Sequence, residues 1–310
     1  MNKLCLILCS KYDFSVDLVI QELEKTGIDY IRLNKEDLSN YLINIDPIKK
    51  VLTVKGHGKN RTVSNITSVW FRQPVFIRNA PAYPLSLEEQ LVRSQWAAFL
   101  RGIIVFEDAI WMNWPSSTYS AESKPYQLML ASKVGFMVPK TMIGNDSSYF
   151  EKFDEEIIVK SLDTVLLREG EDCLFTYTSN ITAKELNEEN TKIAPLTVQE
   201  YVYPKTDIRV TVVGEKLHAV KITSAGRGID NDWRLLKKEE IEYIDIGLPK
   251  LISRYCKDIV SEMGLKFGAI DLIESNGNYY FIEINPTGEW GWLSTEKRPI
   301  EKDIANVLAG

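Results

Sequence analysis

The sequence predicts a mixed α/β (α+β) protein that is built from two or three subdomains. Three observations predict this class. The chain opens with a β-α-β pattern, its second half alternates short strands with glycine and asparagine turns, and its 310 residues are too many for one small core. The apolar fraction of 45% and the charged fraction of 26% are those of an ordinary globular protein.

The opening unit begins with Lys3 to Cys9, a continuous apolar run that fits a buried parallel strand. Ser15 is expected to cap a helix whose apolar residues recur at helical spacing, and Gly27 to end it. Ile28 to Leu33 is the next strand. The unit is similar to a Rossmann-type unit, but no GxGxxG motif follows its first strand. We therefore interpret it as a scaffold and expect no dinucleotide there.

The sequence pattern in the remainder of the N-terminal region predicts short strands and one long helix. Two short strands around a polar turn are expected between Val51 and Phe71. A capping box begins a helix that runs from Ser86 to about Arg101, and Ile103 to Phe106 is expected to be another strand. Aromatic residues and a proline at 111–115 then lead into a Ser/Thr-rich loop, and we place the first domain boundary just after them.

Two lysines are candidate anion ligands in the central region. Lys124 lies at the start of a helix that Gly135 ends, where its ammonium group can join free backbone N–H groups in binding an anion. Lys160 ends a strand that begins at Glu156, and a charged hairpin, Leu162 to Asp172, follows it. Taken singly, each lysine is more often an exposed, solubilising residue.

The most informative stretch runs from Phe267 to Leu293, where two strands flank the hairpin signal Asn276-Gly277. Three side chains on these strands carry oxygen atoms of the kind that Mg²⁺ prefers, namely Asp271, Glu283 and Asn285. Glu283 and Asn285 are two residues apart, so they share a face while the strand persists. An isolated pattern of this kind is more often a solvated surface hairpin.

The register of this hairpin gives a sharper test. A two-residue turn would put Asp271 and Glu283 on opposite faces of the hairpin. We therefore expect a three-residue loop, Asn276 to Asn278, with a glycine bulge, which pairs Asp271 with Glu283. The polar segment from Asn285 to Trp290 ends the second strand abruptly and favours a functional site.

Composition excludes several other classes of function. A net charge of −6 argues against a nucleic-acid surface. The N-terminal apolar run is too short for a secretory signal or a membrane span, so we expect a cytoplasmic protein without a membrane partner. The cysteines have no CxxC spacing and the histidines cannot complete a zinc cluster; these residues are Cys5, Cys9, Cys173 and Cys256, with His57 and His218.

The order of these parts resembles the ATP-grasp superfamily over residues 113 to 293. The resemblance is carried by a lysine before a helix that ends in G-x-x-V-P-x-T, a second lysine that ends a strand, Q-E-Y-V at 199–202, D-I-R-V-x-V-V-G at 207–214, and the D…E-x-N pattern. Three shorter segments resemble the graspetide maturases, the microviridin-type ligases that crosslink ribosomal peptides. They are V-W-F-R-Q-P at 69–74, D-W-R at 232–234 and N-P-T-G-E-W at 285–290.

The resemblance implies an ATP-grasp fold with a Rossmann-like pre-ATP-grasp domain at its N-terminus. Residues 1–115 would form that domain, residues 116–200 a central subdomain with the two lysines and the hairpin, and residues 201–310 a C-terminal subdomain with the metal site. One departure from the superfamily pattern is that no glycine occurs at 161–169, where many members have a glycine-rich loop over the phosphates. The glycines at 225–231 mark a better candidate for a mobile flap.

The resemblance also implies the cofactors, ATP and two Mg²⁺ ions, and a role for each candidate residue. The Glu200 carbonyl and the Val202 N–H would read the adenine edge, while Asp207 would lie near the ribose or at the mouth of the site. The ATP-binding residues would be Lys124, Lys160, Gln199, Glu200, Tyr201, Val202 and Asp207. The metal ligands would be Asp271, Glu283 and Asn285. The catalytic residues that stabilise an acyl phosphate would be Arg209 and Arg234.

By resemblance, the chain is expected to be an ATP-dependent ligase that crosslinks Asp or Glu side chains of a precursor peptide to Thr or Ser hydroxyls, or to Lys amines. Its partner would be a leader-bearing peptide with a Thr/Glu-rich core, and the family suggests a homodimer. The hairpin after Lys160 is a candidate for leader binding. Two alternatives remain open: a glutamate-adding or dipeptide-forming ATP-grasp ligase, and a nucleotide- or peptide-binding protein without turnover.

Overall fold

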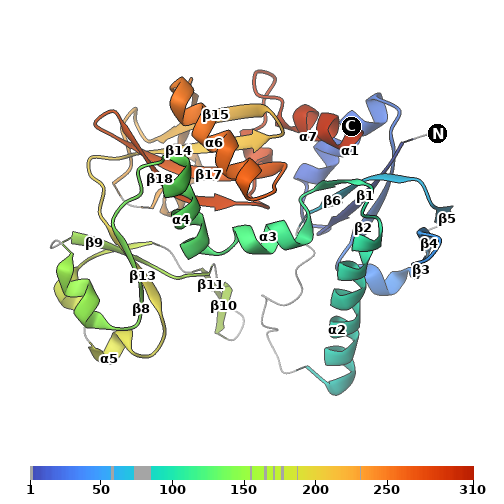
Figure 1. Ribbon diagram of the computed structural model, residues 1–310, viewed down its shortest axis with the longest axis horizontal. Coiled ribbons are helices and arrows are strands. Elements are labelled where there is room, and N and C mark those ends of the chain that lie inside the picture. Colours follow the sequence, from blue (N-terminus) through green and yellow to red (C-terminus); the bar gives the residue numbers. More distant parts are fainter. Residues whose placement is uncertain are drawn as a thin grey trace.

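The computed structural model describes residues 3–56, 59–72, 85–153, 156–163, 166–169, 172–175, 178–186, 188–230 and 232–310. Its three main sheets lie side by side, with the N-terminal sheet at one end, the central sheet at the other, and the C-terminal sheet between them (Figure 1). The mixture of helices and strands confirms the predicted fold class.

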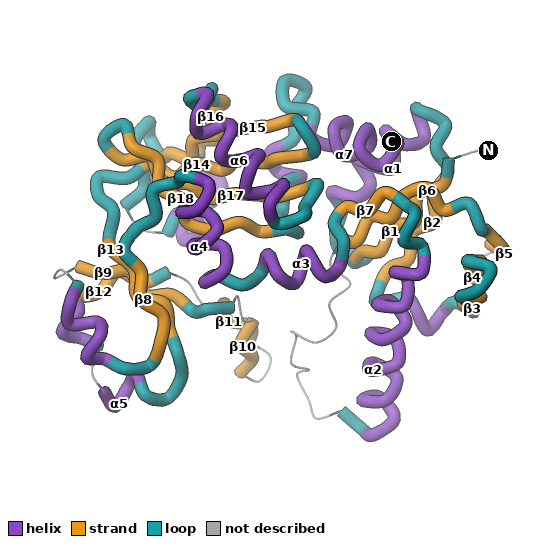
Figure 2. The backbone as a smooth tube through the Cα atoms, in the orientation of Figure 1, coloured by secondary structure: helices purple, strands orange, loops and turns teal. Residues whose placement is uncertain are grey.

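The N-terminal sheet is parallel throughout, in the order β2-β1-β6-β7. Helix α1 (Ser15–Lys25) connects β1 to β2 and buries its apolar side, which confirms the predicted β-α-β opening. A three-stranded antiparallel sheet and helix α2 lie beside this sheet (Figure 2). Their apolar residues share one core with it. The bounds are β1 Leu4–Cys9, β2 Asp29–Asn34, β6 Ile66–Phe71, β7 Ile110–Met112, β3 Leu42–Asp46, β4 Val51–Gly56, β5 Lys59–Val63 and α2 Leu87–Gly102.

Two local predictions in this region are wrong. The expected strand Ile103–Phe106 is a 3₁₀ turn that continues from α2, and β7 is the strand instead. A short apolar run can be buried in either conformation, so its hydrophobicity does not distinguish them. Ser15 does not cap α1, because Phe14 is the residue before the helix and the Ser15 hydroxyl donates to the Asp13 carboxylate. Backbone carbonyls of the preceding turn already accept the first helical N–H groups.

The central sheet is antiparallel, in the order β12-β9-β13-β8, and Lys160 ends β9 as predicted. A small apolar core around Phe150 and Ile157 supports it. The predicted charged hairpin is confirmed as the pair β10-β11, while residues 170–171 and the side chains of both strands lie outside the described part. The bounds are β8 Thr141–Gly144, β9 Glu156–Lys160, β10 Leu166–Glu169, β11 Asp172–Phe175, β12 Ser179–Thr182, α5 Glu188–Thr191 and β13 Leu196–Glu200.

The C-terminal sheet has the order β16-β15-β14-β17-β18 and is antiparallel. Helices α4 and α6 pack on one of its faces, and α3 leads from the N-terminal sheet into α4 (Figure 1). The bounds are α3 Pro115–Ala121, α4 Lys124–Val134, β14 Thr206–Val213, β15 Lys216–Thr223, β16 Glu242–Asp245, α6 Lys250–Glu262, β17 Phe267–Ser275, β18 Asn278–Asn285 and α7 Ile300–Ala309.

The second face of this sheet is covered only over part of its length. Val213, Phe267 and Ala269 pack there in one core with α1 and α7. Because side chains alternate along a strand, Arg209 of β14 and Asp271 of β17 lie on the same face as these apolar residues. The chain therefore places charged groups where the apolar cover ends. The two termini meet on this side of the molecule, since the Lys3 ammonium donates to carbonyls of the last two residues (Figure 1).

Two buried amide side chains hold the end of the C-terminal hairpin. Asn113 donates to the carbonyls of Phe267 (2.9 Å) and Pro286 (2.8 Å), and its Oδ1 accepts from the Phe267 N–H at 2.9 Å. Gln127 of α4 donates to the Ile284 carbonyl at 2.8 Å and accepts from the Ile284 N–H at 3.1 Å. These bonds satisfy buried polar groups and fix the strand end that precedes Asn285.

Three of the four cysteines, Cys5, Cys9 and Cys256, are free and buried. The side chain of Cys173 and the whole of His57 lie outside the described residues. Among the helices that the structure describes, none combines the length and the apolar character needed to cross a bilayer.

Candidate functional site

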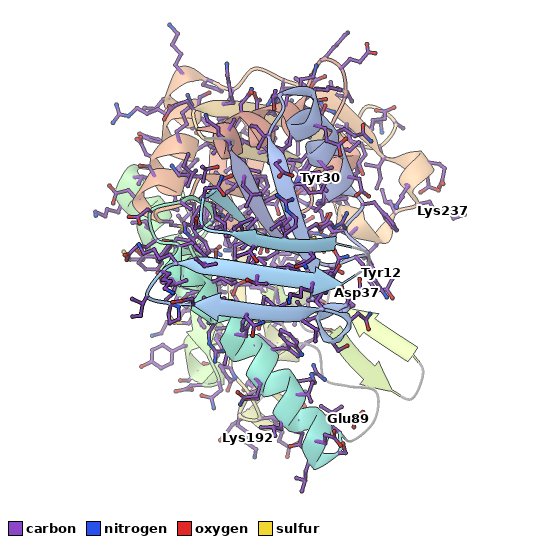
Figure 3. All side chains as sticks on the ribbon, turned by 90° about the vertical axis from the view of Figure 1, so that its right-hand side faces the viewer. Tyr12, Tyr30, Asp37, Glu89, Lys192 and Lys237 are labelled. Carbon is purple, nitrogen blue, oxygen red and sulfur yellow. The ribbon has the colours of Figure 1, made fainter. Side chains whose placement is uncertain are left out.

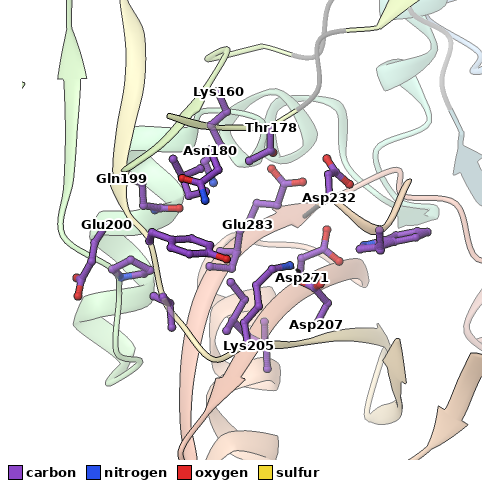
Figure 4. A pocket seen from close by; sticks show the side chains of 18 of the residues that line it. Lys160, Thr178, Asn180, Gln199, Glu200, Lys205, Asp207, Asp232, Asp271 and Glu283 are labelled. Atoms are coloured by element: carbon purple, nitrogen blue, oxygen red, sulfur yellow. Dashed lines mark hydrogen bonds and ion pairs between the residues drawn. The ribbon is translucent and has the colours of Figure 1, made fainter. Parts of the chain in front are cut away.

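A cleft lies between the central and C-terminal sheets (Figure 4). Its empty volume, including space open to solvent, is about 880 Å³. Strands β9, β12 and β13 line one wall, and β14, β17 and β18 line the other. The candidate residues on its walls are Lys160, Gln199, Glu200, Tyr201, Val202, Asp207, Arg234, Asp271 and Glu283.

The hairpin β17-β18 pairs Asp271 directly with Glu283, as the register argument predicts. Both carboxylates point into the cleft from the same face of the sheet (Figure 4). Their proximity on one rigid surface creates a site of concentrated negative charge, which a hard cation or a set of basic side chains must balance.

The predicted three-residue loop is wrong, although the pairing it was meant to explain is confirmed. Asn276-Gly277 is a two-residue turn in which both residues have positive φ, 51° and 80°. The required shift of register lies farther from the turn, between Asp271 and Leu272 of β17. Ile282 is the extra residue on the opposite strand, β18. The type I′ turn suits the strand twist, so the bulge moves into the strand, beside the site whose side chains it re-aims.

Three basic side chains surround the two carboxylates. The Arg209 Nη1 atom lies 2.7 Å from Asp271 Oδ1, and the Lys124 Nζ atom lies 2.6 Å from Glu283 Oε2. Arg234 lies farther away, with Nη2 at 3.4 Å from Asp271 Oδ2 and 3.8 Å from Glu283 Oε1. Arg209 lies in the middle of a sheet strand, where an unpaired charge would be costly to bury. Its ion pair with Asp271 offsets this cost.

The electrostatics of the cleft depend on this balance of charge. Burial opposes the ionisation of Glu283, but Lys124, Lys160 and Arg234 outweigh it and hold the pKa of that carboxyl well below its usual range. Burial lowers the pKa of Lys160 to about 8, although Glu283 opposes this change. An anion placed beside Lys160 would stabilise its charged form.

The strand end at β13 forms the wall that the resemblance assigns to adenine. The Gln199 side chain donates to the Thr141 hydroxyl at 2.8 Å, and the Glu200 N–H donates to the Lys140 carbonyl at 2.9 Å. The Tyr201 hydroxyl donates to the Asp230 carbonyl at 3.4 Å. The backbone at 199–202 is thereby held between β8 and the segment that precedes Asp232.

That segment, residues 225–230, is the described part of the expected flap, and residue 231 lies outside it. Its turn is closed by backbone bonds between Ser224 and Arg227, and Gly228 lies against the Lys205 carbonyl. A Cβ atom at Gly228 would stand 2.0 Å from that oxygen, so only glycine permits the contact. The segment therefore packs against the residue that precedes β14.

Asp207 lies at the start of β14, beside a lysine that sequence reasoning missed. Lys205 Nζ lies 2.6 Å from Asp207 Oδ2, and both residues line the cleft. Burial raises the pKa of Asp207, although Lys205 opposes the rise. The only sequence signal was the spacing of a lysine two residues before an aspartate, next to Pro204.

Three candidate residues do not line the cleft, namely Arg209, which contacts Asp271 as described above, Lys124 and Asn285. Lys124 does not line the cleft but extends its ammonium group to Glu283 from the start of α4. Asn285 follows Glu283 on the same face of β18 and pairs with Ala269 in the ladder. Its Oδ1 accepts from the Thr287 N–H at 3.0 Å, and it does not line the cleft.

Arg72 belongs to a second charged cluster that the sequence indicated only through a motif resemblance. It is 2% exposed, and its Nη1 donates to the carbonyls of Thr287 and Gly288. Its Nε lies 2.9 Å from Asp13 Oδ2, and its Nη2 lies 3.1 Å from Glu289 Oε1. This arginine joins the N-terminal sheet to the turn after β18. Residues 73–74 of the same motif lie outside the described part.

The donor set fits Mg²⁺ better than a softer metal. Two carboxylates and one amide offer only oxygen atoms, and no cluster of three or more His, Cys, Asp or Glu is found within the described ranges. Arg209, Arg234 and Lys124 meanwhile offer donors suited to phosphate oxygens. The Arg209 Nε atom is buried and has no hydrogen-bond partner in the described structure.

No family model matches the chain, and no curated protein matches its sequence. Solved structures do match along its whole length, and they have the ATP-grasp fold. One is a RiPP-associated ATP-grasp ligase from Chryseobacterium gregarium, solved with ADP and a leader and core peptide. It is 27% identical, with a TM-score of 0.86, and the match covers 100% of this chain and 97% of that one.

Two further structures are macrocyclases from Microcystis aeruginosa. MdnB is 25% identical with a TM-score of 0.79, and the match covers 99% of both chains. MdnC, bound with the precursor peptide MdnA, is 23% identical with a TM-score of 0.82 and the same coverage, and this likeness shows the shared fold. The predicted resemblance to ATP-grasp maturases of ribosomal peptides is confirmed, and the enzyme class is that of an ATP-dependent ligase.

Proposed function

We propose that this chain activates Asp or Glu side chains of a ribosomal precursor peptide with ATP and crosslinks them to Thr or Ser hydroxyls, or to Lys amines. One observation carries the proposal. The facing pair Asp271 and Glu283, surrounded by Arg209, Arg234 and Lys124, lies in the cleft of a chain that matches a peptide-bound ATP-grasp ligase over its full length.

ATP would occupy the cleft with its phosphates beside Lys124 and Lys160, where a charge-assisted hydrogen bond contributes about 1.5 to 3 kcal/mol. The backbone of Gln199 to Val202 would bind the adenine, and Asp207 would lie near the ribose or the mouth. Asp271, Glu283 and Asn285 would hold two Mg²⁺ ions. When bound, these ions would offset the negative charge of the phosphates.

The role of Arg209 and Arg234 follows from the chemistry of the carboxylate. A carboxylate repels nucleophiles, and phosphorylation turns one of its oxygens into a leaving group. The two guanidinium groups would stabilise the resulting acyl phosphate. A hydroxyl or amine then forms a bond to the carbonyl carbon and gives up its proton, the C–O bond to phosphate breaks, and phosphate leaves with the electron pair.

The proposal extends to the organisation and partners of the chain. Residues 1–115 form the pre-ATP-grasp scaffold, residues 116–200 the central subdomain and residues 201–310 the subdomain with the metal site. The precursor has a Thr/Glu-rich core, and its leader contacts the β10-β11 hairpin. The chain works in the cytoplasm as a homodimer. These statements rest on the sequence pattern and the resemblance.

The test is the intact mass of the peptide encoded by a short reading frame beside this gene, with repeated Thr and Glu/Asp clusters, after incubation with the protein, ATP and Mg²⁺. Each crosslink is expected to remove about 18 Da, the mass of one water. The Glu283→Gln variant should give no loss. ATP binding without any mass change would instead support the dipeptide-type ligase or the non-catalytic binding protein.

A further inference from the structure

A second hollow of the surface lies on the N-terminal side of the reaction site. It is lined mainly by Tyr12, Phe14, Leu18 and Trp292, and Glu289 also faces it. We call these five residues the aromatic groove. Its empty volume, with the space open to solvent, is about 1010 Å³. Tyr12 and Phe14 are 67% and 74% exposed, which is unusual for side chains of this size.

The groove occupies a favourable place in the fold. It lies beyond the carboxyl end of β1 and beside the first turn of α1, and ligands of open α/β sheets bind at this edge. Figure 3 shows Tyr12 near Asp37, which follows the carboxyl end of the neighbouring parallel strand β2. We expect no dinucleotide there, because β1 is not followed by a glycine-rich phosphate loop.

The groove is continuous with the reaction site through two of its members. The Glu289 carbonyl accepts from Arg209 Nη2 at 3.4 Å, and Arg209 Nη1 is 2.7 Å from Asp271. The Trp292 ring lies 5.8 Å from that of Trp233, which lines the cleft proposed for ATP. A peptide in the groove would therefore lead directly to the arginine that we assign to the acyl phosphate.

The charge of the groove decides which part of a peptide it fits. The described residues that line it include Asp13 and Glu289 and no basic side chain, while the buried Arg72 behind them lies 2.9 Å from Asp13 and 3.1 Å from Glu289. A substrate carboxylate would find no basic partner among these lining residues, whereas it meets Arg209 and Arg234 beside Asp271 at the reaction site. A hydroxyl or an ammonium group can instead donate a hydrogen bond to Glu289, and aromatic rings bind a peptide chain through large apolar contacts.

We infer that the aromatic groove receives the segment of the precursor peptide that carries the attacking hydroxyl or amine, and that Glu289 accepts a hydrogen bond from that group. The inference rests on the proposed function and adds to it a separate docking site for the second reactant. Activation and attack would then be served by different surfaces, joined at Arg209. Removing the groove should impair attack more than activation.

The experiment separates these two steps with hydroxylamine, a small nucleophile that does not need the groove. The probe is the precursor peptide of the adjacent reading frame, with ATP and Mg²⁺. An acyl phosphate that hydroxylamine intercepts gains about 15 Da as the hydroxamate, whereas ring closure removes about 18 Da. In the double variant Tyr12→Ala/Phe14→Ala, the ratio of crosslink to hydroxamate should fall about tenfold.

The matched control is Ile48→Ala/Ile193→Ala, which removes exposed apolar side chains away from the groove, at 91% and 81% exposure. Its ratio should equal that of the wild type. An unchanged ratio in the groove variant, or a parallel loss of both products, would overturn the inference. If the wild type yields neither product, the proposed function itself fails.

Glu289 gives an independent test with a conservative variant. Glu289→Gln keeps an acceptor oxygen and should retain most crosslinking, whereas Glu289→Ala should lower the ratio of crosslink to hydroxamate about tenfold. The Glu289 side chain is 56% exposed, so neither change leaves a large cavity. Equal ratios in the alanine variant and the wild type would exclude its role in orienting the nucleophile.

Discussion

Arg72 and Arg234 each pair a guanidinium group with carboxylates, but the two arginines differ in burial and in the length of their contacts. Arg72 is 2% exposed, and it donates to two backbone carbonyls, at 287 and 288, and to the Asp13 carboxylate at 2.9 Å. The Arg234 side chain is 42% exposed and lies 3.3 to 3.8 Å from three carboxylates in the cleft. The Arg72 guanidinium is buried and bound within the chain through Nε and Nη1, and its Nη2 has only an ion-pair contact with Glu289. The Arg234 guanidinium has long, partly solvated contacts.

The difference separates a charge that supports the fold from one that is available to a ligand. A buried ion pair is costly to break, because its partner is left without compensation in a medium that solvates it poorly. A partly exposed pair contributes little, because water replaces it easily. Phosphate oxygens of a ligand could take the place of the carboxylates around Arg234 at small cost in free energy. The backbone carbonyls around Arg72 are buried, so a ligand cannot take their place.

The largest effect expected from this comparison is on stability. Arg72→Ala should lower the free energy of unfolding by about 3–5 kcal/mol, because it leaves the buried Asp13 carboxylate without its cation and two carbonyls without the Arg72 donor. Urea denaturation measures the change. Arg254→Ala, which breaks an exposed pair with Asp258, should cost no more than about 0.5 kcal/mol. Similar values for the two variants would remove the distinction.

Arg234→Ala should have the opposite profile. It should change the free energy of unfolding by less than about 1 kcal/mol, since its contacts are long and partly solvated. It should lower the rate of crosslinking about 100-fold, the effect of losing one donor to developing charge. The rate is measured by intact mass, and stability by the same urea titration. Normal turnover in this variant would argue against a catalytic role for Arg234.

A smaller effect is expected on the pH dependence of ATP binding. Burial lowers the pKa of Lys160 to about 8, and ATP phosphates would favour its charged form. ATP affinity should therefore be constant below about pH 8 and fall about tenfold for each pH unit above it. Calorimetry across this range should show a flatter profile for Lys160→Arg, whose charge persists. Identical profiles would contradict the assignment of Lys160 to the phosphates.

The smallest effect concerns the turn that carries the metal-site hairpin. Gly277 has a φ of +80° and no atom within 4 Å of a built Cβ, so Gly277→Ala would incur only a backbone penalty of about 1 kcal/mol. Gly247→Ala, where φ is not positive and space is also open, is the matched control and should be neutral. Thermal unfolding compares them. A neutral Gly277→Ala would mean that the turn relaxes.

Much of the site could be predicted because it depends on local patterns. Alternation along the strands placed Asp271 opposite Glu283, and a lysine at the end of β9 was visible in the sequence. The position of the bulge was not predictable, since a three-residue loop and an Asn-Gly turn followed by a bulge within the strand give the same pairing of Asp271 with Glu283. The turn at 103–105 was missed for a similar reason, because burial of a short apolar run is compatible with several conformations.

The sequence by itself determined the fold class, the β-α-β opening and several of the charged groups in the cleft, although not Lys205, because periodicity and residue chemistry are local properties. Only the tertiary structure decided that Asn113 binds the backbone at Phe267 and Pro286, that Arg72 holds the turn after β18, and that Glu289 and Tyr12 line one groove. These contacts join residues far apart in the chain. Their partners are set by the packing of three sheets, which no local pattern encodes.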